Sequence, residues 1–159
     1  MSETVVEKRE FLRHTLAALA YRVSRAVEGA PDEFASFDGA GKAPARILAH
    51  MGDLFDWALS ISRGDEKWHN SEPLPWPEEK HRFFATLETF DALLASSEPI
   101  DAPLERLFQG PVADALTHTG QIAMLRRLSG FKKLDEDFFL AKITVGTVGA
   151  EQPAPVQQY

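Results

Sequence analysis

The sequence has 159 residues, and its 17 Lys and Arg against 24 Asp and Glu give a formal net charge of −7. This charge argues against a nucleic-acid partner, because nucleic-acid-binding domains carry basic patches or stripes. The absence of cysteine excludes thiolate metal sites, catalytic thiols and disulfides. The first ten residues, MSETVVEKRE, lack the apolar run of a signal peptide, and no stretch approaches the ~18 apolar residues of a membrane span. We therefore expect one cytoplasmic domain over residues 1–159, without a membrane partner.

The first predicted helix begins at about Ser2 or Thr4 and ends at Val27. Leucine and valine recur along it at spacings of three and four, which is the pattern of an amphipathic helix. Residues 28–43 then contain several glycines and a proline, so they are predicted to form a connector.

The second predicted helix runs from Pro44 to Ser62 and includes the stretch ILAHMGDLFDWAL. His50 lies one turn from both Ile47 and Leu54, so it is expected to face the same packed region. Asp53 follows three residues later and could border a site there. A lone histidine on an apolar face is more often a core residue than a metal ligand, so this helix alone does not define a site.

A loop over Arg63–Trp76 separates this helix from the third, which is predicted over Pro77–Ser96. The loop is long enough either to cross the length of a bundle or to make an excursion between antiparallel neighbours. Its tryptophans, Trp68 and Trp76, could line a pocket mouth or pin the loop to the bundle.

The fourth helix is predicted over Pro111–Ser129, with proline at its first position and Gly130 as a left-handed cap. Asp114 and His118 are four residues apart and therefore leave the same face. Because Gln121, Leu125 and Leu128 continue that face, we expect it to point into the core. An inward carboxylate and imidazole need partners, either protein groups or a shared metal ion.

The bundle core is predicted over residues 4–130, and residues 131–159 form an irregular C-terminal tail. Within the tail, Asp135–Lys142 could form a short helix, and the following ITVGTVG is β-branched and rich in glycine. Such a tail could wrap the bundle or reach a neighbouring subunit. We expect a homodimer, since closed two-fold dimers are the commonest oligomers, with Phe138–Val148 as a contributing segment.

Four amphipathic helices joined by long connectors predict an all-α fold, a four-helix bundle. Bundles commonly build metal sites from side chains on facing helices. Here the second helix offers His50, and the fourth offers Asp114 and His118. Three such ligands leave positions open for water or substrate, as in catalytic zinc sites and in the two-histidine, one-carboxylate sites of non-haem iron. Nickel and manganese are further alternatives.

The stretches ILAHMGDLFDWAL and HTGQIAMLRRLSG resemble the DinB/YfiT-like family, and the resemblance extends from about Leu12 to Gly130. It implies a bundle in up-down-down-up order, with the Arg63–Trp76 loop as the long crossover. It also implies a divalent metal ion held by three side chains.

In the family pattern, one metal-binding histidine comes from the second helix and two, four residues apart, come from the fourth. His50 matches the first position and His118 the last, whereas Asp114 stands where the family has histidine. Aspartate keeps a group that can bind metal, but it adds negative charge and shifts the preference toward harder metals.

Three functional hypotheses follow. The first is a metalloenzyme acting on an unknown small-molecule substrate, with hydrolase-like chemistry or, as in some DinB-like relatives, thiol S-transfer. Asp53 and Gln121 would then orient ligands or substrate. The second is a metal-binding or stress-response module without catalysis. The third has no metal, and Asp114 and His118 satisfy each other's polar network.

Overall fold

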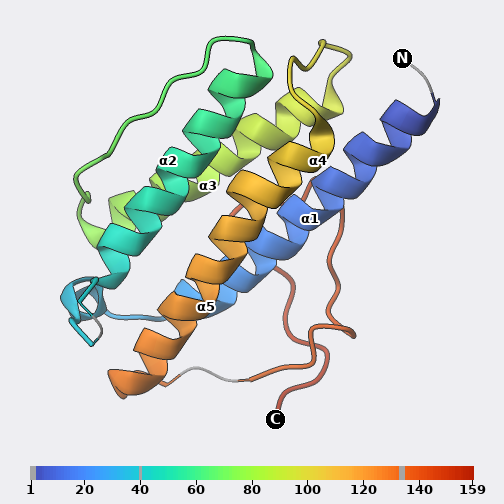
Figure 1. Cartoon of the computed structure of the whole chain (residues 1–159). Helices are drawn as coiled ribbons and strands as arrows, with labels where there is room; N and C mark the ends of the chain where they lie inside the picture. Colours follow the sequence, from blue (N-terminus) through green and yellow to red (C-terminus); the bar gives the residue numbers. More distant parts are fainter. Residues whose placement is uncertain (1–2, 40, 133–134) are drawn as a thin grey trace.

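The computed structural model describes residues 3–39, 41–132 and 135–159. Within these ranges the chain is all-helical, which confirms the predicted all-α bundle, and β structure is limited to one isolated bridge between Glu136 and Gln158. Among the same residues, no helix is long and apolar enough to cross a bilayer. The long helices are α1 (Glu3–Val27), α2 (Pro44–Ser62), α3 (Trp76–Ala95) and α5 (Ala113–Leu128), and the short ones are η1 (Asp32–Ser36), α4 (Leu104–Leu107) and η2 (Phe108–Val112) (Figure 1).

The predicted bounds of α1, α2 and α3 agree closely with the structure. The start and end of α2 are those predicted, and α1 and α3 differ from prediction by about one residue. The predicted start at Ser2 lies outside the described residues. Proline in the first turns of α2 and α3 explains the agreement. Its fixed φ favours a helix start, and the N–H that proline lacks would make no hydrogen bond within the helix at that position.

Two contacts between helix ends define the direction of the outer helices. The Arg9 guanidinium, near the start of α1, donates to the Ser96 carbonyl oxygen just beyond α3 at 2.7 Å. Arg126, near the end of α5, donates to the Ala26 carbonyl oxygen at the end of α1 at 3.0 Å. Hence α1 is antiparallel to α3 and parallel to α5. In Figure 1 the loop after α2 returns along the whole helix before α3 begins, so α2 and α3 are parallel to each other. The order of the helices is thus up-down-down-up.

The crossover loop between α2 and α3 is fastened at two places. The Asp53 carboxylate on α2 accepts hydrogen bonds from the Ser71 backbone N–H at 2.8 Å and from the Ser71 hydroxyl at 2.7 Å. Glu79 on α3 is fully buried and accepts the Leu74 N–H at 2.8 Å. Trp76, at the loop's end, is 2 % exposed and packs edge-on against Phe34. Of the two roles considered for the tryptophans, Trp76 therefore has the pinning one.

The beginning of the fourth long helix differs from prediction. We expected a helix that starts after Gly110 with Pro111 in its first turn, whereas the chain is helical from Leu104 onward and Pro111 lies inside the π-helical turn η2. Proline within an α-helix lacks the N–H of one hydrogen bond and crowds the carbonyl four residues back. The wider π turn accommodates both defects locally, so the helix continues into α5. At the other end, Gly130 has φ +80°, which confirms the predicted left-handed cap.

The tail is anchored on α1. The buried Glu136 accepts hydrogen bonds from the Tyr21 hydroxyl at 2.7 Å and from Arg25 Nε at 2.8 Å. Val148 is 3 % exposed and belongs to the core. The tail therefore wraps the bundle, one of the two alternatives that the sequence left open.

The short helix considered for Asp135–Lys142 is absent, and turns and the bridge at Glu136 occupy this stretch. The Asp137 carboxylate accepts the Phe139 N–H at 2.9 Å. Such local side-chain hydrogen bonding competes with the helical pattern. The turn leaves Phe139 95 % exposed.

Candidate metal centre

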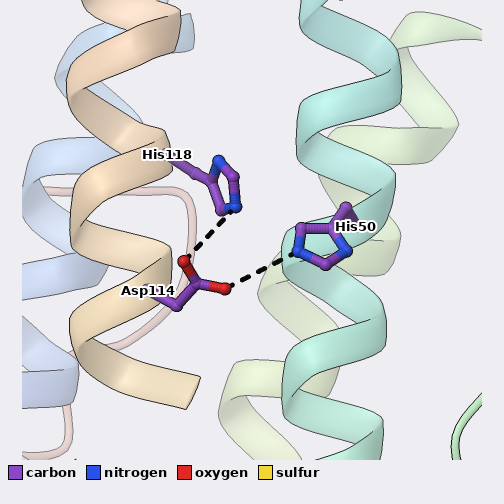
Figure 2. Close-up of side chains that lie close together, drawn as sticks. All are labelled: His50, Asp114 and His118. Atoms are coloured by element: carbon purple, nitrogen blue, oxygen red, sulfur yellow. Dashed lines mark ion pairs between the residues drawn. The ribbon is translucent and has the colours of Figure 1, made fainter. Parts of the chain in front are cut away.

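Two facing helices bring together the three residues that the sequence singled out. His50 extends from α2, and Asp114 and His118 extend from α5 toward it (Figure 2). One Asp114 oxygen lies 3.7 Å from His50 Nε2, and the other lies 3.5 Å from His118 Nε2. α2 and α5 are antiparallel neighbours. His50, in the second turn of α2, lies beside Asp114 and His118 in the first two turns of α5.

The separations suit a single divalent ion. Two ligands about 2.0–2.2 Å from a tetrahedral zinc ion lie roughly 3.3–3.6 Å apart, which is close to both of the distances to Asp114. One ligand atom from each of the three residues lies within 4.8 Å of the other two. The donor set of two imidazoles and one carboxylate is also one that zinc, iron and nickel accept. The three residues therefore fit a divalent metal ion.

The site lies at the edge of the core and not within it, contrary to prediction. The side chains of His118, His50 and Asp114 are 14 %, 35 % and 46 % exposed. The expected inward stripe through Gln121 and Leu128 is wrong, because both are exposed. Leu125 is buried, as predicted. The other core-facing residues of α5 each follow a member of that stripe by one position; they are Ala115, Thr119, Ile122 and Arg126.

Gln121 fixes the orientation of the His118 ring. Its side-chain oxygen lies 2.8 Å from His118 Nδ1 and accepts a hydrogen bond when that nitrogen carries the proton. The Nε2 atom, which faces Asp114, then keeps its lone pair for a metal ion. Such partners on the far nitrogen are typical of metal-binding histidines.

A cavity of about 190 Å³ opens beside the three residues and is lined by both histidines. The ring centroids of His50 and His118 are 4.9 Å apart, and the Trp68 ring of the crossover loop lies 5.7 Å from that of His50. Trp68 is 45 % exposed and also packs edge-on against Trp57, with ring centroids 5.9 Å apart, and it does not line the cavity. A larger hollow of about 600 Å³ near His81 is lined by none of the three residues.

A second polar cluster lies around His69, a residue that the sequence analysis did not identify. His69 Nε2 lies 3.0 Å from an Asp53 oxygen and 3.3 Å from an Asp56 oxygen. Burial raises the pKa of Asp56, while the nearby charges of His69 and Arg82 oppose that rise. The spacing on α2 places Asp53 near His50. No pattern in the loop sequence indicates His69, because the contact between His69 and Asp53 depends on the path of the crossover loop.

Comparison of the chain with models of known protein families, with curated proteins and with solved structures finds no match.

Proposed function

We propose that this chain is a DinB/YfiT-like metalloprotein in which His50, Asp114 and His118 hold one divalent ion, with zinc or nickel favoured and iron or manganese as alternatives. The supporting observation is the convergence of three side chains from two helices, with Asp114 at 3.5 and 3.7 Å from the two histidine nitrogens. The π turn that directly precedes α5 adds support, because such turns are frequent at functional sites.

The proposed activity is that of a metal-dependent enzyme acting on a small molecule, by hydrolase-like chemistry or thiol S-transfer. A divalent ion in this position would lower the pKa of a water or thiol ligand and so supply a nucleophile near neutral pH. In this proposal Gln121 keeps the His118 Nε2 lone pair directed at the site, and Trp68 packs edge-on against the His50 ring.

The alternative is a metal-binding or stress-response module without turnover. The exposure of Asp114 favours an open site that solvent or a ligand can reach, which suits catalysis better than a closed structural site. Screening activated esters and thiol-transfer substrates separates these two functions.

Metal content is the decisive test. We expect untagged wild-type protein to retain about one divalent ion per chain and His50→Ala to lose it. Because a ligand at 100 times its Kd stabilises the folded state by about 2.7 kcal/mol, added metal should raise the Tm of the wild type by roughly 5–10 °C. His81→Ala, an exposed histidine of α3, is the matched control and should behave like the wild type. Equal metal content in wild type and His50→Ala would refute the site.

We also propose that the chain forms a homodimer through the face that α1, α5 and the tail share. A groove of about 450 Å³ on this face is lined by Leu116, Gly120, Ala123 and Phe138. Phe139, the neighbour of Phe138, is 95 % exposed beside it. Arg22 and Arg127 also line the groove, so a second copy would meet both apolar and charged side chains there. A two-fold interface could bury the exposed Phe139 ring and the apolar part of the groove together. A second copy is therefore the occupant we propose for the groove.

Light scattering tests the dimer. We expect twice the chain mass for the wild type and a shift toward the monomer for Phe139→Ser. Val156→Ser changes another exposed apolar residue and is the control. A monomeric wild type at high concentration would contradict the proposal.

A further inference from the structure

The cavity beside the candidate metal centre has a cationic wall. Lys42, Arg46 and His50 recur at spacings of four residues around the start of α2, and all three line the cavity together with His118. Arg46 and His50 lie one turn apart on the same side of α2, whereas Lys42 lies two residues before the helix and joins them in the cavity lining. This local positive charge contrasts with the net charge of −7 of the whole chain.

The acidic side chain of the cavity does not cancel this charge. Asp53 is 2 % exposed, and its carboxylate already accepts two hydrogen bonds from Ser71. It also lies 3.0 Å from His69 and 3.5 Å from Arg82. These partners offset much of its negative charge. Asp114 does not line the cavity, although it lies 3.7 Å from His50, and a metal ion bound between them would offset its charge. Lys42 and Arg46 are therefore the charged side chains in the cavity lining that an anion would meet.

An oxyanion already lies against Arg46. The Glu72 carboxylate of the crossover loop accepts a hydrogen bond from Arg46 Nη2 at 2.9 Å. The two side chains are 50 % and 84 % exposed, and such surface pairs contribute little to stability. A ligand carboxylate or phosphate could therefore replace Glu72 at the guanidinium, which binds either group with two parallel hydrogen bonds.

We infer that this cavity binds the anionic group of a small substrate, a carboxylate or a phosphate, through Lys42 and Arg46. Such an anchor holds the rest of the substrate toward His50 and His118. The substrate is small, because a cavity of about 190 Å³ is below the ~300–1,000 Å³ of pockets for drug-sized ligands. The link to catalysis rests on the proposed function, whereas binding of the anion requires only the two cationic side chains.

Titration with inorganic phosphate, followed by NMR of the histidine side chains and by calorimetry, tests the inference. The protein is used as purified, and the metal content of each sample is measured. We expect the Lys42→Ala/Arg46→Ala double variant to bind phosphate at least about tenfold more weakly, since charge-assisted hydrogen bonds are lost. Glu72→Gln should bind phosphate several-fold more tightly, because it removes the competing carboxylate. Lys67→Ala, whose exposed amine lies outside the cavity lining, removes one positive charge elsewhere; it is the control and should equal the wild type.

The outcomes separate this inference from the proposed metal site. Phosphate binding that depends on Lys42 and Arg46 supports the anion site, even in a protein that proves unable to hold metal. Retained metal together with phosphate affinity that is equal in wild type, double variant and Glu72→Gln overturns the anion site and leaves the metal proposal intact. Phosphate binding lost equally in Lys67→Ala also overturns it, because the effect would then be one of net charge alone.

Discussion

Asp53 is predicted to be the main fastening point of the crossover loop, and its replacement by alanine tests that role. The carboxylate accepts hydrogen bonds from the Ser71 N–H at 2.8 Å and from the Ser71 hydroxyl at 2.7 Å. Arg82 adds charge attraction at 3.5 Å, and His69 Nε2 lies 3.0 Å away. Only 2 % of Asp53 is exposed, so solvent cannot replace these partners without a rearrangement of the loop.

The magnitude follows from these contacts. A hydrogen bond to a charged group contributes about 1.5–3 kcal/mol, and removing one partner of a buried charged network destabilises by about 3–5 kcal/mol. Arg82 keeps Glu79 at 2.9 Å and the Ala49 carbonyl oxygen at 2.9 Å, so it is not left unpaired. We therefore expect Asp53→Ala to lower the free energy of unfolding by about 3 kcal/mol, the lower end of that range.

Urea denaturation measures the change, with tryptophan fluorescence as the signal because Trp68 neighbours His69. Asp56→Ala is the matched control. It also removes a carboxylate near His69, at 3.3 Å, but its side chain is 36 % exposed, and the expected loss is below about 1 kcal/mol. Equal losses in the two variants would show that Asp53 does not fasten the loop.

Two further predictions concern the candidate site and the tail. If Asp114 binds metal directly, Asp114→Asn should lower metal affinity by more than the ~10–100-fold typical of indirect partners, and Asp114→His should retain zinc; unchanged affinity in competition titrations of Asp114→Asn would remove it from the ligand set. Burial, and next the hydrogen bond to Glu136, raise the pKa of Tyr21 above its usual value of about 10. The folded chain then holds this proton more tightly than the unfolded chain, so the associated stability is fully present below about pH 10 and is lost as the pH rises through the folded-state pKa. Tyr21→Phe should flatten this alkaline loss in urea midpoints measured between about pH 8 and 11, and an unchanged slope would assign the loss to other groups.

The helices could be predicted from the sequence because their signals are local. Pro44, Trp76-Pro77 and Gly130 mark ends that depend only on backbone preference, and the apolar spacing of three and four defines the segments between them. The short helix expected over Asp135–Lys142 does not form, and its cause is also local: the Phe139 N–H donates a hydrogen bond to the Asp137 side chain. The bridge that holds this stretch comes from Gln158, far along the chain, and no local pattern indicates it.

The sequence predicted which residues of the candidate site lie together, but it did not predict their exposure. A spacing of four residues places Asp114 and His118 on one face in any α-helix, but which side of that face meets the core depends on packing against α1 and α2. The core of α5 is built from Ala115, Thr119 and Ile122, each one residue after Asp114, His118 and Gln121. The displacement of one residue corresponds to about 100° around the helix axis. It turns the three polar side chains from the core toward the surface of the bundle.

That rotation also bears on what the site can do. A carboxylate and two imidazoles buried together would be held in place by their desolvation and would favour mutual pairing over exchange. In the structure the Asp114 side chain is 46 % exposed, whereas the His118 side chain is more buried and is oriented by Gln121. The His118 side of the arrangement is thus held by a hydrogen bond, and the Asp114 side is open to solvent. An open side is what the proposed metal ion would need in order to bind an exchangeable ligand as well.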